Sequence, residues 1–169
     1  MIEINKESEE KAFSHKIFGR KTMILVTGGA GYIGSHTCTG LIEQGHEIVV
    51  VDNLINSAVE AISRIEEITG KSVAFVEGDV RDEVFLCNIF TKFQIESVMH
   101  FAGLKSVGES NNHPLKYYDN NISGMLILLK VMGDHGCKNL EFSSSATVYG
   151  SPAKLPVAET APLSALNPY

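Results

Sequence analysis

The 169-residue chain lacks the residue patterns of metal-binding, disulfide-rich and membrane-spanning proteins. Its three cysteines are far apart and show no Cys-x-x-Cys spacing, so they indicate neither a disulfide framework nor a zinc site. The six histidines are scattered without the spacing of metal ligands, and no apolar run is long enough to cross a bilayer. We therefore expect reduced thiols, no bound metal, no membrane association and a cytoplasmic location.

An excess of positive charge is also missing. Lys and Arg number 14 against 20 Asp and Glu, which gives a net charge of −6 at pH 7. Nucleic acids and anionic membranes are bound by basic surfaces, so this charge argues against both as general partners. With 44% hydrophobic and 20% charged residues, the composition is that of an ordinary globular protein, and the length suits one domain core.

The first 22 residues lack the apolar core of a secretion signal, and their acidic residues argue against a mitochondrial transit peptide. We expect a flexible, frayed or partly helical extension over residues 1–22, for which a regulatory or docking role stays open. The folded domain is expected over residues 23–169.

What the chain does have is the pattern of a strand, a tight turn and a helix over residues 23–34, MILVTGGAGYIG. The turn contains Gly28, Gly29, Gly31 and Gly34. It fits Gly-x-Gly-x-x-Gly from the second glycine, or Gly-x-x-Gly-x-x-Gly from the first. Such glycines let the backbone approach a pyrophosphate closely, and the following helix N-terminus offers unpaired N–H groups to the phosphates.

The next apolar run ends in Asp52, near the separation at which a dinucleotide-binding fold places an acid on the ribose hydroxyls. A carboxylate there repels a 2′-phosphate, so NAD is favoured over NADP. Asn53, Asn56 and Ser57 in the following loop either face the adenosine or serve as turn residues. Asp79, after the third strand, either accepts a hydrogen bond from the adenine amino group or caps a turn.

Apolar strands alternate with helical segments along the whole domain. We expect strands at residues 23–26, 48–51, 73–76, 98–101 and 140–142, and helices over 32–44, 58–69, 82–93 and 115–134. Crossovers of this length produce parallel pairing, so we predict an α/β, Rossmann-type, doubly wound sheet of order 3-2-1-4-5. Its ligand crevice should lie beyond the carboxyl ends of strands one and four.

Three helices carry explicit predictions of which side chains face inward. The helix over 32–44 should bury Ile33, Thr37, Leu41 and Ile42, and the helix over 82–93 should bury Phe85, Leu86, Ile89, Phe90 and Phe93. In the helix over 58–69, Val59, Ile62, Ile65 and Ile68 recur every three residues. Residues 104–114 are expected to be a polar connection. The helix after it should bury Tyr118, Ile122, Met125, Leu126, Leu129 and Met132.

Four segments resemble the extended short-chain dehydrogenase/reductase family, in particular its 4-epimerases that interconvert UDP-galactose and UDP-glucose. They are TGGAGYIGSH at 27–36, HFAGLKSVGES at 100–110, YYDNN at 117–121 and FSSSATVYG at 142–150. The likeness covers residues 23–169. It implies an enzyme that binds NAD and a UDP-sugar, transiently oxidises the sugar at C4, and forms a homodimer through its long fourth helix.

The resemblance also implies a role for each matched position. Ser145 matches the serine that hydrogen-bonds the reacting sugar hydroxyl, and Tyr169 matches the tyrosine that removes its proton; both would contact the substrate, as would Lys105. The pyrophosphate would meet Gly28, Gly31, Tyr32, Ile33 and Gly34; the adenosine would meet Asp52, Asn53, Asn56, Ser57, Asp79 and Val80; and the nicotinamide half would meet Phe101, Ala102, Gly103, Lys105, Asn120 and Ser143.

The sequence departs from the family pattern at its end. It stops at Tyr169, before the family's lysine four residues later and before the remaining strands and the small substrate domain. We therefore expect the amino-terminal part of an epimerase, inactive alone. The alternatives are a non-catalytic NAD-binding module and another NAD-dependent nucleotide-sugar epimerase or decarboxylase. A 4,6-dehydratase is disfavoured, because Ala146 and Thr147 stand where those enzymes carry an Asp-Glu pair.

Overall fold

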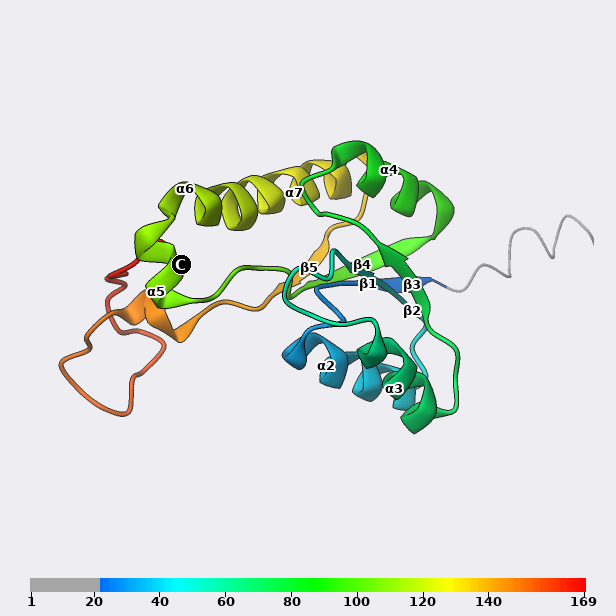
Figure 1. The fold of residues 1–169 in the computed structure, drawn as a ribbon, viewed down its shortest axis with the longest axis horizontal. Helices are drawn as coiled ribbons and strands as arrows, with labels where there is room; N and C mark the ends of the chain where they lie inside the picture. The colour runs from blue at the N-terminus through cyan, green and yellow to red at the C-terminus, as the bar shows by residue number, and fades with distance from the viewer. Residues whose placement is uncertain (1–21) are drawn as a thin grey trace, which may run out of the picture.

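A computed structural model describes residues 22–169, so the predicted extension lies outside the described residues except for its last position. Five parallel strands form one sheet of order β3-β2-β1-β4-β5, which confirms the predicted topology (Figure 1). The strands are β1 (Met23–Thr27), β2 (Ile48–Asp52), β3 (Ala74–Glu77), β4 (Ile95–His100) and β5 (Asn139–Phe142).

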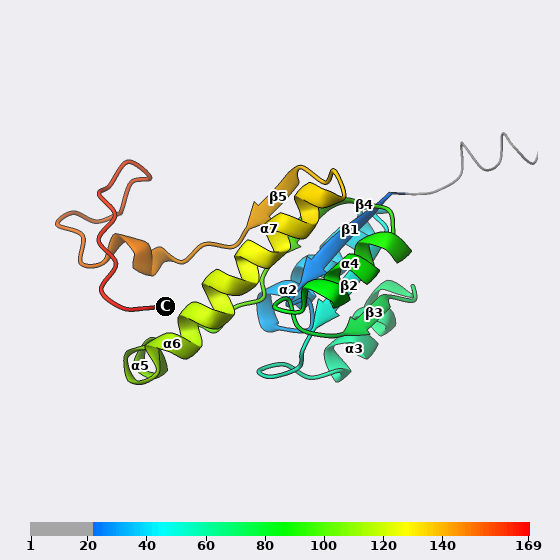
Figure 2. The ribbon, with the colours of Figure 1, turned by 90° about the horizontal axis from the view of Figure 1, so that it is seen from above.

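Helices cover both faces of the sheet (Figures 1 and 2). On one face lie α2 (Tyr32–Glu43) and α3 (Glu60–Thr69), and on the other lie α4 (Glu83–Lys92) and α7 (Gly124–Asp134). The remaining elements are α5 (Val107–Asn112), α6 (Pro114–Tyr117), a π-helix η1 (Tyr118–Ser123) and a 3₁₀ helix η2 (Ala146–Tyr149). Within residues 22–169, no helix combines the length and apolar character needed to cross a membrane.

The interior strand β2 is buried on both faces, and its side chains divide between two cores. Val49 and Val51 pack with the inner faces of α4 and α7, whereas Ile48 and Val50 pack with those of α2 and α3. This alternation is the period-two arrangement of a strand, and burial on both faces explains its uninterrupted apolar sequence. The three cysteines are free thiols, as expected.

The predicted inner face of the long helix is wrong in four of its members. Tyr118, Ile122, Leu126 and Leu129 are exposed, although Met132 is buried as predicted. The segment is apolar on two sides, so its periodicity does not identify which side faces the core. The buried side contains Gly124, Leu128, Val131 and Met132, and a Cβ at Gly124 would lie 3.0 Å from the Val80 side chain, so a small residue favours the close approach of this side to the loop after β3.

Two smaller predictions also differ from the structure. Ile33, expected on the inner face of α2, is exposed, while Ile42 on the same helix is buried as expected. The expected polar connection contains the short helix α5. Its start was recognisable from the Ser-x-x-Glu pattern of a capping box, because the Ser106 hydroxyl accepts a hydrogen bond from the backbone N–H of Glu109 at 3.3 Å.

Candidate functional site

A cleft of about 430 Å³ opens at the carboxyl ends of β1, β2 and β4, beside the N-terminus of α2. This is the switch point of the strand order, where the topology predicts a ligand site. All residues predicted to contact a cofactor line the cleft except Asp79 and Ser143. The lining also includes residues that sequence reasoning missed: Val51, Ile55, Gly78, Leu104, Ser106, Glu109 and Tyr117.

The glycine-rich turn after β1 forms one wall of this cleft. Gly28 has φ +72°, and a Cβ there would lie 2.5 Å from the backbone nitrogen of Ala102. A Cβ on Gly34 would overlap the carbonyl oxygen of Gly28. Gly29 lies outside the cleft, and its missing Cβ makes room for the Val50 side chain instead. The lining residues therefore follow the pattern Gly-x-x-Gly-x-x-Gly from Gly28.

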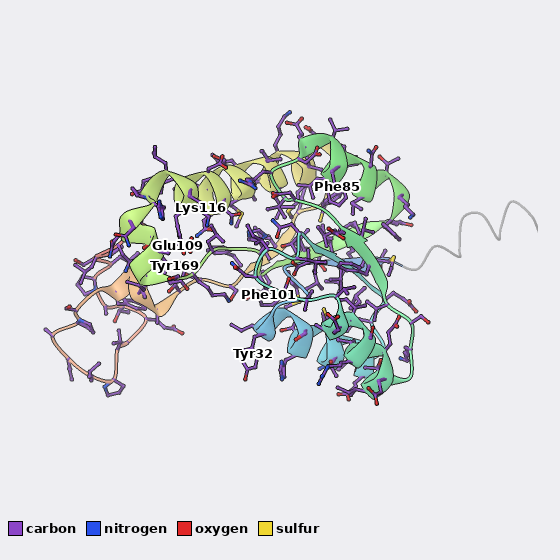
Figure 3. All side chains as sticks on the ribbon, in the orientation of Figure 1. Tyr32, Phe85, Phe101, Glu109, Lys116 and Tyr169 are labelled. Carbon is purple, nitrogen blue, oxygen red and sulfur yellow. The ribbon has the colours of Figure 1, made fainter. Side chains whose placement is uncertain are left out.

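The N-terminus of α2 points its free backbone donors toward the same wall. Its first intrahelical hydrogen bond runs from the Ser35 N–H to the Gly31 carbonyl, at 2.9 Å. The N–H groups of Tyr32, Ile33 and Gly34 therefore precede the helical ladder and carry the partial positive charge of the helix end. Tyr32 is largely exposed beside this wall (Figure 3). The arrangement suits a phosphate group.

Asp52 ties this turn to the loop after β2. It is 8% exposed, and its Oδ2 accepts a hydrogen bond from the Ala30 N–H at 3.0 Å. Its Oδ1 accepts hydrogen bonds from the Leu54 N–H at 3.0 Å and from the Ser57 hydroxyl at 2.7 Å. The Asp52 carboxylate thus links the glycine-rich turn to the loop after β2. The Ser57 hydroxyl donates its hydrogen bond to this carboxylate and so stabilises the loop.

Asp79 lies beside the cleft rather than in its lining. Its carboxylate accepts hydrogen bonds from Asn53 Nδ2 at 3.0 Å and from Arg81 Nε and Nη2 at 3.0 and 2.7 Å. The Arg81 guanidinium also pairs with Asp119 at 2.6 Å, and it holds the pKa of Asp79 well below its usual range. These contacts show the loop-ordering role of Asp79. Its predicted contact with adenine stays a prediction, while Val80 does line the cleft.

The other end of the cleft is built by the loop after β4 and by the segment from α5 to η1. Tyr117 is completely buried there, and its hydroxyl donates a hydrogen bond to Glu109 Oε2 at 2.8 Å. Lys116 donates to Glu109 Oε1 at 2.6 Å (Figure 3). Burial and the Glu109 carboxylate raise the pKa of Tyr117, whereas Lys116 lowers the pKa of Glu109. Tyr117 thus remains a neutral hydroxyl around pH 7.

Of the three residues predicted to contact the substrate, Lys105 lines the cleft, whereas Ser145 and Tyr169 do not. The Ser145 hydroxyl caps η2, accepting a hydrogen bond from the Thr147 N–H at 3.1 Å. Ser143 is exposed, and its N–H donates to the His100 carbonyl at 3.2 Å. Tyr169 is half-buried at the end of the chain, which lies beside α5 and α6 in both views (Figures 1 and 2). The roles of Ser143, Ser145 and Tyr169 stay predictions.

Beneath the cleft, Thr27 and His100 form a buried pair at the ends of β1 and β4. The Thr27 hydroxyl and His100 Nδ1 are 2.7 Å apart, and the imidazole stacks on Phe142 with ring centroids 5.9 Å apart. Burial lowers the pKa of His100 to about 4, so the ring is neutral at pH 7. No cluster of three or more His, Cys, Asp or Glu in the described part of the chain is arranged to hold a metal ion.

Comparisons with known proteins agree with this geometry. The family model described as GDP-mannose 4,6 dehydratase matches residues 25–169. The chain is 60% identical over 146 residues to the UDP-glucose 4-epimerase of Dictyostelium discoideum and 57% identical to that of Bacillus subtilis, matching 86% of its own length in each case. It spans only 42% and 43% of the lengths of these relatives.

Solved structures give the same result. A UDP-glucose 4-epimerase from Stenotrophomonas maltophila with bound NAD and formylated UDP-arabinopyranose matches with a TM-score of 0.85 and 52% identity. One from Bifidobacterium longum, in complex with NAD+ and UDP, matches with a TM-score of 0.86 and 51% identity. Each alignment covers 88% of this chain and 44% of the solved chain.

Proposed function

Because this chain belongs to the family described as GDP-mannose 4,6 dehydratase, we propose that it is the NAD-binding part of an enzyme that interconverts UDP-galactose and UDP-glucose. The main support for the proposal is the cleft, because the glycine-rich turn, Asp52 and the loop after β4 all line it. Among the sequenced relatives, those at 57–60% identity are UDP-glucose 4-epimerases. A 4,6-dehydratase stays disfavoured by Ala146 and Thr147.

The cleft fits a dinucleotide on its own geometry. Cβ atoms at Gly28 and Gly34 would clash with the backbone of Ala102 and with the carbonyl of Gly28, so the tight turn that a pyrophosphate-binding loop needs depends on glycine at both positions. The N–H groups of the first turn of α2 bind phosphate oxygens, and Asp52 faces the ribose hydroxyls and repels a 2′-phosphate. The loop from Phe101 to Lys105 bounds the nicotinamide half.

The chemistry of the reaction is divided between cofactor and protein. NAD, when bound, would supply a reversible hydride acceptor, because the hydride removed from sugar C4 must return to the opposite face of the same carbon for an epimerisation without net oxidation. Ser145 hydrogen-bonds the 4-hydroxyl and Tyr169 takes its proton. A tyrosine has a pKa near 10, so it acts as a base at neutral pH only beside positive charge.

Calorimetric titration with NAD tests the binding half of this proposal. We expect saturable binding of one NAD to the 169-residue chain, weaker binding of NADP, and no turnover of UDP-galactose by this chain alone, since it spans only 42% of the relatives' length. Absence of NAD binding would refute the proposal.

A chimera tests the catalytic half and separates it from a non-catalytic module. Residues 23–169 are joined to the remaining part of the Bacillus subtilis relative, which is 57% identical over the aligned region. We expect the chimera to epimerise UDP-galactose and its Tyr169→Phe variant to lose this activity. A chimera that binds NAD without turnover would favour the non-catalytic alternative.

Substituting Asp52 should weaken NAD binding and narrow the preference for NAD over NADP. Asp52→Asn removes the charge and turns an amide donor toward the N–H of Ala30 or toward the donors of the loop after β2. We expect roughly a tenfold loss of NAD affinity, as for the loss of a charged hydrogen-bond acceptor, measured by calorimetry. Asp82→Asn is the matched control, because Asp82 caps α4 and Asn caps equally well. Equal losses in both variants would contradict the assignment.

We also propose a homodimer through the long helical segment that α6, η1 and α7 form together. Its outer face carries an exposed apolar stripe made up of Leu115, Tyr118, Ile122, Leu126 and Leu129. Contiguous apolar surface of this kind is typical of a protein interface. In analytical ultracentrifugation, we expect the wild-type chain to sediment as a dimer and Leu126→Glu to sediment as a monomer. Leu155→Glu, at an exposed leucine outside this helical segment, should remain a dimer. A wild-type chain that sediments as a monomer would contradict this proposal.

A further inference from the structure

The loop that carries Lys105 is held on both sides of that residue by side chains of one helical segment. On one side, Asn121 Oδ1 accepts a hydrogen bond from the Leu104 N–H at 2.9 Å, and Asn121 Nδ2 donates to the Leu104 carbonyl at 2.8 Å. On the other side, the Ser106 N–H donates to the Tyr117 hydroxyl at 3.1 Å. The backbone on both flanks of Lys105 is therefore fixed.

The two side chains of this clamp are themselves held in place. The Tyr117 ring is completely buried, and its hydroxyl uses its proton on Glu109, whose other oxygen is held by Lys116. Asn121 lies four residues later in the π-helix and accepts a further hydrogen bond from Asn120 Nδ2 at 2.9 Å. π-helical turns are rare and occur frequently at functional sites.

The residue between the clamped positions is free. Lys105 lines the cleft, and it makes no hydrogen bond or ion pair with any residue from 22 to 169. Lys71, Lys116 and Lys130 each have a protein acceptor, whereas Lys138 and Lys154 are exposed and, within the described part of the chain, unpaired like Lys105. Lys105 differs from these two because it lines the cleft and follows a clamped backbone position. An unpaired ammonium in a cleft, on a backbone that is already held in place, favours ligand binding. The fixed backbone reduces the conformational entropy that is lost when a ligand binds to the ammonium.

We propose that Tyr117 and Asn121 are positioning residues that fix the backbone of Lys105, so that its ammonium meets the nicotinamide half of the bound dinucleotide. Neither side chain needs to touch the cofactor for this role. The inference rests on the proposed NAD binding. It adds that the affinity depends on the conformation of the loop after β4 through these two hydrogen-bonded side chains.

The alternative is that Tyr117 and Asn121 only stabilise the fold. A double-mutant cycle distinguishes this structural role from the positioning role. NAD affinity is measured by calorimetry for the wild-type chain, Tyr117→Phe, Lys105→Ala and the double variant. Tyr117→Phe removes one hydroxyl and keeps the ring. We expect it to weaken NAD binding roughly fivefold in the wild-type background, as for one lost hydrogen bond, and by less than about twofold when Lys105 is absent.

The neighbouring tyrosine provides the matched control. Tyr118 is exposed and does not line the cleft, and Tyr118→Phe keeps the apolar ring that the proposed dimer stripe uses, so it should leave NAD affinity unchanged in both backgrounds. Denaturation by urea, followed by circular dichroism, establishes that each variant is folded under the binding conditions. If Tyr117→Phe does not fold, the same cycle is run with Asn121→Asp, which replaces the donor to the Leu104 carbonyl by an acceptor.

The outcomes are distinct. Equal losses of NAD affinity with and without Lys105 would overturn the positioning role while leaving the proposed function intact. Tyr117→Phe and Asn121→Asp variants that fold and bind NAD as the wild type does would also overturn it. A wild-type chain that does not bind NAD would overturn the proposed function together with this inference.

Discussion

Gly34→Ala is expected to reduce NAD affinity by more than about 100-fold. The added Cβ would overlap the carbonyl oxygen of Gly28 and approach the Cα of Gly29, and both are backbone atoms of the turn that forms the phosphate wall. Backbone cannot rotate away as a flexible side chain can, so the turn and the start of α2 must move apart. A 100-fold change corresponds to about 2.7 kcal/mol, within the cost of an overpacked buried site. Calorimetric titration of the folded variant measures it.

The same helix contains the control for this substitution. Gly40 lies in α2, and a Cβ there would meet no atom within 4 Å. Gly40→Ala should leave NAD affinity unchanged and raise the free energy of unfolding by roughly 0.5–1 kcal/mol, because alanine favours a helix more than glycine does. If Gly34→Ala binds NAD as tightly as Gly40→Ala, the dinucleotide does not lie against this turn.

Acid is expected to remove roughly 3 kcal/mol of stability through His100 alone. Burial lowers its pKa from 6.5 to about 4, so the unfolded chain binds the proton more tightly than the folded chain does. The contribution of the neutral ring is therefore fully present above pH 6.5 and is lost as the pH falls toward 4. Urea denaturation at intervals from pH 7.5 to pH 4.5 measures the loss.

His100→Gln isolates this contribution. Glutamine does not titrate, and its amide can still hydrogen-bond the Thr27 hydroxyl that His100 contacts. Its stability should depend less steeply on pH between 6.5 and 4.5 than that of the wild type, and acid effects shared by both proteins cancel in the difference. The stability that the low pKa of Asp79 contributes is lost mainly below its ordinary value of 3.8, and the small part of this loss that reaches pH 4.5 is shared by both proteins. Parallel curves would show that His100 is not the titrating group.

The sheet and the glycine wall could be predicted because each depends on local patterns. The short, β-branched apolar runs before Gly28 and before Asp52 are bounded by turn signals, which favours strands, and the helices between strands require parallel, right-handed crossovers. Strand order then brings the turn after β1 and the loop after β4 to one edge. Asp52 follows from the same reasoning, because it directly ends a strand adjacent to β1.

The residues that were missed depend on contacts between distant segments. Glu109 and Tyr117 line the cleft because α5 and α6 lie next to the loop after β4. No short-range sequence pattern predicts this arrangement of the two helices. The side chains of Asn53 and Arg81 donate hydrogen bonds to the Asp79 carboxylate. The sequence did not predict that protein donors occupy this carboxylate. The same applies to Ser145, which the structure shows capping η2.

The sequence alone determined the order of strands, the pattern of glycines and the acid at the end of β2, because chain connectivity and local backbone geometry are enough to place them. Only the tertiary structure decided which apolar side of the long helix faces the core, since that side packs against segments distant in the chain, such as Val80 beside Gly124. It also decided that Lys105 lies between two clamped residues. Both outcomes depend on close packing between segments that are far apart in the chain.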